Sequence, residues 1–78
     1  MDQELKTLLD RCKSNDQAAQ SALYRRFASK VFATALRYTD SRDEAADIAQ
    51  ESWIKVFRHL VKFTEFNSFE GWVRRITV

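Results

Sequence analysis

Residues 41–72 of the chain read SRDEAADIAQESWIKVFRHLVKFTEFNSFEGW. Within them, core-type side chains recur at steps of three and four residues, as on one face of an amphipathic helix. The members of this stripe are Ala45, Ala49, Trp53, Val56 and Leu60, widened by Ile48, Ser52 and Phe57. Ser41 and Glu44 have capping-box spacing. We therefore predict a helix that begins at Ser41 and continues to about Lys62.

The opposite face of this predicted helix is polar, and it is acidic near its start. Its members are Asp43, Asp47, Gln50, Glu51, Ile54 and Arg58. A solvated helix face and a protein-docking surface both explain these residues. Ile54 favours docking, because an apolar centre with a polar rim is typical of interfaces. A magnesium site is less favoured, since the carboxylates lie on one helix without a second set.

Length and composition restrict the fold class. The 78 residues allow one domain, and the 45% hydrophobic content supports one small core. There is no proline and only one glycine, which argues against a turn-rich β fold. No apolar run approaches the ~18 residues that span a bilayer, and no signal-peptide pattern is present. We therefore expect a soluble, cytoplasmic protein without membrane insertion.

Three further helices are predicted outside the central one. The first covers residues 2–14, the second covers about 17–38, and the last begins near Phe69. Asn15 and Asp16 separate the first two, and Asp16 can cap the second. Asn67 or Ser68 can cap the last helix. The chain is thus expected to form an all-α, compact bundle of four helices.

Charge is distributed unevenly along the chain. Residues 55–78 carry five basic and two acidic side chains, although the net charge of the whole chain is only +2. Single-stranded nucleic acid is held by aromatics that stack on bases and cations that follow the backbone. Both kinds gather here, as Lys55, Lys62, Phe63, Phe66, Phe69, Trp72, Arg74 and Arg75.

Burial in the core is the alternative explanation for these aromatics. It is favoured for Phe69 and Trp72, whereas Phe66, in the middle of the expected loop, is left open. Asn67 and Ser68 can cap the last helix or offer hydrogen bonds to a base edge.

Signs of catalysis are weak. His59 is the only histidine, which disfavours a histidine-rich metal site or a Ser-His-Asp triad. Cys12 is the only cysteine and lies on the apolar stripe of the first helix, where burial makes a thiol unreactive. We predict no catalytic residue, no metal and no cofactor.

One combined pattern resembles a known family. It is Asp43-Glu-Ala-Ala-Asp47-Ile-Ala-Gln50-Glu51, then Val56-Phe57, Leu60, Phe63 and Phe69-x-x-Trp72-Val-x-Arg75-Ile76. This resembles region 2 of bacterial sigma-70 family sigma factors, most closely the extracytoplasmic-function (ECF, group 4) type. The resemblance covers nearly the whole chain. It implies a transcription initiation domain that binds core RNA polymerase and recognises and melts the minus-ten promoter element.

The resemblance also implies roles for individual residues. The polar face of the central helix would dock on the clamp helices of the polymerase β′ subunit, through Asp43, Asp47, Gln50, Glu51, Ile54 and Arg58. The loop and last helix would bind the non-template strand of the minus-ten element. The residues concerned are Lys55, Lys62, Phe63, Phe66, Asn67, Ser68, Phe69, Trp72, Arg74 and Arg75. An anti-sigma factor is a possible further partner.

Some features depart from the family. The recognition helix of the family continues beyond Val78 and a second sigma domain follows, so residues 1–78 are expected to be a fragment consisting of region 2. Trp53 stands where a smaller residue is common, and we expect it to pack in the core. The alternative function is a helical protein–protein interaction module without nucleic-acid binding.

Overall fold

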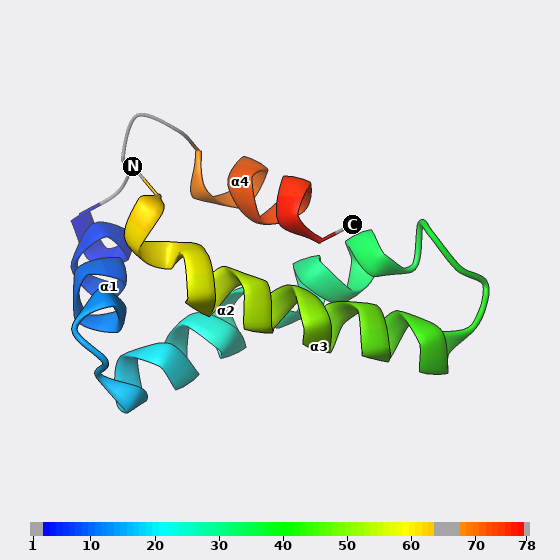
Figure 1. The fold of residues 1–78 in the computed structure, drawn as a ribbon, viewed down its shortest axis with the longest axis horizontal. Helices are drawn as coiled ribbons and strands as arrows, with labels where there is room; N and C mark the ends of the chain where they lie inside the picture. The colour runs from blue at the N-terminus through cyan, green and yellow to red at the C-terminus, as the bar shows by residue number, and fades with distance from the viewer. Residues whose placement is uncertain (1–2, 64–67, 78) are drawn as a thin grey trace.

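Four α-helices make up most of residues 3–63 and 68–77, the part of the chain that the computed structural model describes (Figure 1). They are α1 (Gln3–Lys13), α2 (Gln17–Ala35), α3 (Arg42–His59) and α4 (Phe69–Ile76), with a short 3-10 helix, η1 (Leu60–Lys62), directly after α3. Helix α2 contacts each of the other three α-helices. The predicted all-α bundle is confirmed.

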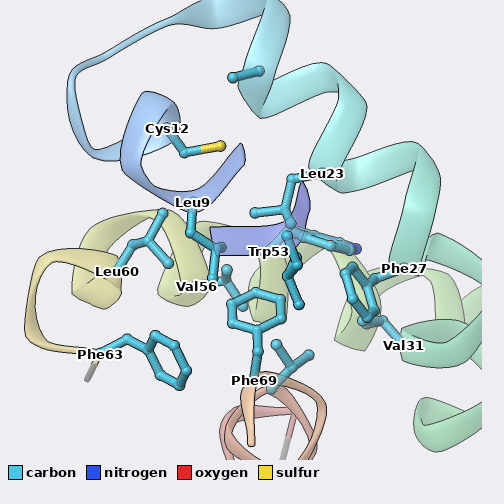
Figure 2. Packing of buried hydrophobic residues seen from close by; sticks show 13 residues of the cluster. Leu9, Cys12, Leu23, Phe27, Val31, Trp53, Val56, Leu60, Phe63 and Phe69 are labelled. Carbon is cyan, nitrogen blue, oxygen red and sulfur yellow. The ribbon is translucent and has the colours of Figure 1, made fainter. Parts of the chain in front are cut away.

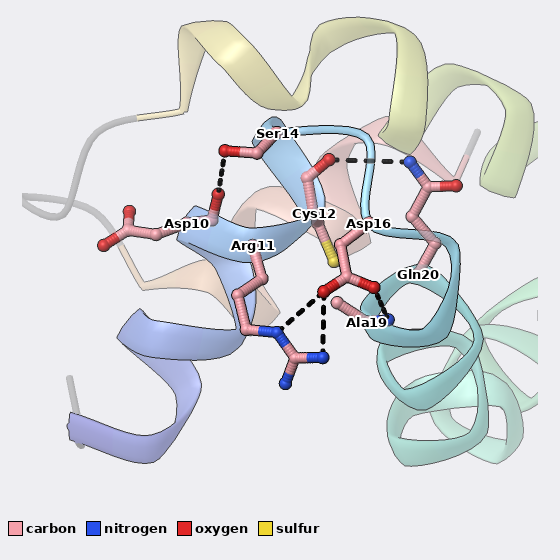
Figure 3. A network of polar contacts seen from close by, with 7 residues as sticks. All are labelled: Asp10, Arg11, Cys12, Ser14, Asp16, Ala19 and Gln20. Carbon is pink, nitrogen blue, oxygen red and sulfur yellow. Dashed lines mark hydrogen bonds and ion pairs between the residues drawn. The ribbon is translucent and has the colours of Figure 1, made fainter.

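Local hydrogen bonds end α1 and begin α2. Asn15 adopts a positive φ of 65°, a conformation that asparagine tolerates well. The N–H of Asn15 donates to the carbonyl of Cys12, and that of Asp16 to the carbonyl of Arg11, which is a Schellman motif. The Asp16 carboxylate then accepts from the N–H of Ala19 at 3.1 Å and caps α2, as predicted (Figure 3).

The start of α3 follows the predicted cap with one difference. The Ser41 hydroxyl accepts from the N–H of Glu44 at 3.2 Å. In a capping box the glutamate would accept from the N–H of Ser41. Here that N–H donates to the hydroxyl of Thr39, and the Thr39 hydroxyl donates to the Glu44 carboxylate at 2.7 Å. The Thr39 hydroxyl therefore bridges the Ser41 N–H and the Glu44 carboxylate, which a capping box would join directly.

Two helices are shorter than predicted. Helix α2 ends at Ala35, three residues before Tyr38, because the N–H groups of Arg37 and Tyr38 donate three residues back along the chain. Helix α3 ends at His59, and residues 60–62 continue as the 3-10 helix η1. Such tightening of the last turn satisfies carbonyls that a helix end leaves unpaired.

The core forms where the apolar stripes of all four α-helices meet η1 (Figure 2). Phe69 of α4 packs edge-on against Phe27 of α2 at 5.2 Å between ring centroids. Trp53 is 6% exposed and its ring contacts that of Tyr24, so its predicted place in the core is confirmed. Cys12 is also buried, and this burial raises the pKa of its thiol. A thiol held in its neutral form is a poor nucleophile.

Two buried hydroxyl residues connect α3 to the end of α4. Ser52 Oγ lies 2.7 Å from the Ile48 carbonyl and 3.3 Å from the Thr77 carbonyl, so its one hydrogen can serve either acceptor. Thr77 Oγ1 donates to the Val73 carbonyl at 2.8 Å. The C-terminal end of α4 is thereby fixed against the middle of α3.

No described helix is both long and apolar enough to cross a membrane.

Candidate functional site

The polar face of α3 is open to solvent. All six residues that the sequence predicts for docking are exposed: Asp43, Asp47, Gln50, Glu51, Ile54 and Arg58. Ile54 is a large apolar side chain with 52% of its surface exposed. Within the described residues, no hydrogen bond or ion pair engages the side chains of Asp47, Gln50 or Glu51. These groups are therefore available to a partner.

A hollow of about 440 Å³ adjoins this face between α2 and α3. It is lined by Tyr24, Ala28, Phe32, Ala46, Ala49, Gln50 and Trp53. Gln50 thus belongs both to the polar face and to the lining of this hollow. Tyr24 contacts the buried ring of Trp53, yet 49% of its own surface is exposed. Helical spacing alone does not show this exposure, because it does not say how far α3 covers α2.

The aromatic residues at the other end of the chain differ in exposure. Phe63 and Phe69 are 5% and 2% exposed, and their rings meet edge-on at 5.4 Å. Trp72 is half-buried and its ring contacts both. Phe69 is therefore buried in the core, as the alternative explanation for the aromatics predicted. Contact of Phe63, Phe69 or Trp72 with DNA stays a prediction. Phe66 lies outside the described residues.

Ser68 is exposed and is the N-cap of α4. Its hydroxyl oxygen accepts from the N–H of Gly71 at 3.3 Å, which leaves its hydroxyl hydrogen free to donate elsewhere. Capping and a hydrogen bond to a base are therefore compatible at this residue. Asn67, the other candidate cap, lies outside the described residues.

The cationic residues predicted for DNA binding are mostly exposed. Lys62, Arg74 and Arg75 are exposed and Lys55 is half-buried. Lys13 of α1 donates from Nζ to the Phe63 carbonyl at 3.2 Å, at the point where the chain leaves η1. Fifty positions separate this pair, so nothing local in the sequence indicates it. Lys13 thereby helps to hold the end of η1.

An acidic side chain interrupts this basic surface. Glu70 Oε1 lies 2.6 Å from Lys30 Nζ, and Glu70 Oε2 lies 3.6 Å from an Arg74 guanidinium nitrogen. The hydrogen bond and the positive charge of Lys30 lower the pKa of Glu70, with a smaller contribution from Arg74. Glu70 is therefore ionised at neutral pH. Within residues 3–63 and 68–77, no cluster of three or more His, Cys, Asp or Glu is placed to hold a metal ion.

Comparisons with known proteins identify relatives of this arrangement. The family model described as Sigma-70 region 2 matches residues 23–78. The ECF RNA polymerase sigma factor SigE of Mycolicibacterium smegmatis is 37% identical over 67 residues, covering 82% of this chain and 26% of that protein. The ECF RNA polymerase sigma-E factor of Haemophilus influenzae is 35% identical over 71 residues, covering 91% of this chain and 37% of that protein.

A solved structure is similar in both fold and sequence. It is the NMR structure of the complex formed by an engineered region 2 of sigmaE in complex with GTAAAA. It superposes with a TM-score of 0.82 at 34% identity, covering 99% of this chain and 82% of that one. By contrast, the chain spans only 26% and 37% of the length of the two curated relatives.

Proposed function

The chain belongs to the Sigma-70 region 2 family, with relatives of the ECF type, and we propose that it binds core RNA polymerase and recognises and melts the minus-ten promoter element. One observation carries this proposal: two open surfaces of different chemistry lie on different helices. The face on α3 is acidic with an apolar centre, whereas α4 and its flanks carry the exposed cations Lys62, Arg74 and Arg75 and the half-buried Trp72. On this view the domain acts by binding, without catalysis, in the cytoplasm.

The polymerase-binding half of the proposal rests on α3. Asp43, Asp47, Gln50, Glu51, Ile54 and Arg58 would contact the β′ clamp helices. Their exposure, the absence of partners for Asp47, Gln50 and Glu51 among the described residues, and the adjoining hollow support this role. Anti-sigma factors are proposed as competitors for the same surfaces.

The DNA-binding half rests on α4 and the segment before it. Lys62, Ser68, Trp72, Arg74 and Arg75 offer accessible groups to the non-template strand. Lys55, Phe66 and Asn67 are included through the family resemblance. We assign Phe63 and Phe69 a positioning role, because their buried rings fix α4 against η1. Extracting a base costs a few kcal/mol, and aromatic stacking at roughly 1–3 kcal/mol per base can offset this cost.

Strand preference tests the DNA-binding half. Fluorescence anisotropy would measure binding of labelled single strands that contain GTAAAA or its complement TTTTAC. We expect tighter binding of the GTAAAA strand and a strong loss of affinity with salt. Equal affinity for the two strands would contradict minus-ten recognition.

A charge reversal tests the polymerase-binding half. Glu51→Arg should abolish capture of the β′ clamp helices in a pull-down, because it places a cation in the centre of the acidic face. Glu4→Arg makes the same change at an exposed position of α1 and should leave capture intact. Equal recovery with all three proteins would refute this docking face.

The apolar hollow beside α3 favours one alternative, a helical protein–protein interaction module without a nucleic-acid role. Under that alternative, Phe66→Ala and Arg75→Ala leave function intact, whereas Ile54→Asp abolishes it. A sigma region 2 domain instead requires both surfaces. Measuring capture of the β′ clamp helices and binding of the GTAAAA strand with these three variants would distinguish the two functions.

A further inference from the structure

A basic groove lies between α2 and α4, beside the residues already assigned to DNA. Residues 17–39 contain four cationic side chains and no acidic one: Arg25, Arg26, Lys30 and Arg37. Two of these, Lys30 and Arg37, line a groove of about 290 Å³ together with Glu70 and Arg74 of α4. The groove is thus lined by three cations and one carboxylate, and its lining also includes the buried residues Phe27, Val31 and Val73.

The Glu70 carboxylate accepts a hydrogen bond from Lys30 and forms a longer ion pair with Arg74. Lys30 Nζ lies 2.6 Å from Oε1, and Arg74 lies 3.6 Å from Oε2. The side chains of Lys30, Glu70 and Arg74 are 60%, 44% and 59% exposed. Ion pairs this exposed contribute little to folding stability, so another anion can replace the carboxylate at small cost to the fold.

Resting on the proposed function, we propose that this groove is an additional binding site for a DNA backbone phosphate. Lys30, Arg37 and Arg74 would hold the phosphate, and Glu70 occupies the cations as an internal competitor until DNA binds. Carboxylate and phosphate oxygens accept charge-assisted hydrogen bonds from the same lysine and arginine donors.

Continuity favours DNA over an acidic protein as the ligand. Arg74 belongs both to the groove and to the cationic side chains of α4, so a strand bound along α4 can continue onto α2. The docking face on α3, which we assign to the polymerase, is itself acidic at its start and does not share the residues of this groove. The groove therefore extends the nucleic-acid surface and not the protein surface.

Glu70 should restrain DNA affinity and its salt dependence. Its negative charge repels phosphates and neutralises cations that would otherwise release counterions. Each phosphate neutralised on single-stranded DNA adds about 0.7 to the slope of log affinity against log salt. Removing the charge of Glu70 should therefore tighten binding and make the slope steeper.

The test is anisotropy with the labelled GTAAAA strand at about 50 mM and about 200 mM NaCl. Glu70→Gln should tighten binding roughly fivefold at the lower salt, and Lys30→Gln should weaken it to a similar extent. The double variant should bind more tightly than Lys30→Gln but more weakly than Glu70→Gln, because the carboxylate also pairs with Arg74 and repels the phosphate directly. Thermal melts by circular dichroism would verify that each variant is folded.

Two matched controls separate local from global charge effects. Asp10→Asn removes a negative charge from the exposed face of α1. Arg25→Gln removes a positive charge from α2 at a residue that lines a different hollow, with Gln17 and Tyr24. Both controls should change affinity by less than about twofold, since exposed distant charges are screened.

Each outcome decides between the proposals. If wild type prefers the GTAAAA strand but Glu70→Gln and Lys30→Gln match their controls, the groove proposal fails and the proposed function stands. If wild type binds neither strand, both fail. If polyglutamate binds as tightly as the oligonucleotide and depends equally on Lys30, the groove serves acidic partners and the phosphate proposal is overturned.

Discussion

Asp16 shows how much a single side chain can do at a helix start. Its carboxylate caps α2 and also pairs with Arg11 at 2.9 Å (Figure 3). The backbone hydrogen bond from Ala19, followed by the hydrogen bond from Arg11, lowers the pKa of Asp16. A lowered folded-state pKa means that the stabilisation is present above about pH 4 and is lost as the pH falls through the folded value.

Asp16→Ala should lower the melting temperature by roughly 5 °C at neutral pH, because the first turn of α2 loses its cap. Asp16→Asn keeps a capping oxygen but loses the charge, so its melting temperature should fall by less. As the pH falls below about 4, wild type and Asp16→Asn should converge. Circular dichroism melts across this pH range would check both statements, and a gap independent of pH would contradict them.

At the scale of elements, α4 depends on what it packs against. Its eight residues are fewer than the ~12 that an isolated helix needs to be even marginally stable in water. Two features hold it: the buried faces of Phe69 and Val73, and the hydroxyl contact between Ser52 and the Thr77 carbonyl. The proposed DNA-binding side chains are therefore placed by contacts with α2, α3 and η1.

Ser52→Ala should detach the end of α4 from α3. The buried Thr77 carbonyl loses a donor, which should cost about 1 kcal/mol of unfolding free energy. Hydrogen exchange should accelerate in α4 more than in α2, and affinity for the GTAAAA strand should fall. Ser29→Ala, at an exposed position of α2, is the control and should change neither quantity. Uniform exchange changes along the whole chain would argue against a local role.

At the scale of the molecule, the two proposed surfaces should act independently. Ile54 of α3 and Arg75 of α4 are both exposed and share no partner among the described residues. Substitutions at sites without shared contacts usually have additive effects. Ile54→Asp should therefore abolish polymerase capture and leave oligonucleotide affinity unchanged.

Arg75→Gln should have the opposite effect, weakening the oligonucleotide complex roughly threefold and leaving polymerase capture intact. A pull-down with the β′ clamp helices and anisotropy with the GTAAAA strand would be run on both variants. If either substitution impaired both activities, the surfaces would be coupled and the separation would be wrong.

The sequence alone determined the helices, most of their caps and the family. The helices and caps depend on side chains that lie within a few positions of each other: the three-and-four spacing from Ala45 to Leu60, and the caps at Asp16 and Ser41. The family follows from a combined pattern of residue types between Asp43 and Ile76. The six exposed residues on α3 could be predicted for the same reason, since helix periodicity settles which side faces away from an apolar stripe. The resemblance to the ECF-type sigma-70 region 2 family is confirmed.

Only the tertiary structure decided how distant positions meet. Lys30 and Glu70 are 40 positions apart, Lys13 and Phe63 are 50 apart, and Ser52 and Thr77 are 25 apart. The same holds for the burial of Phe63 and the exposure of Tyr24. Helix periodicity says which face is apolar, but it does not set how far one helix slides or rotates against another. That arrangement comes from packing the whole core, and it decides which cations surround Glu70.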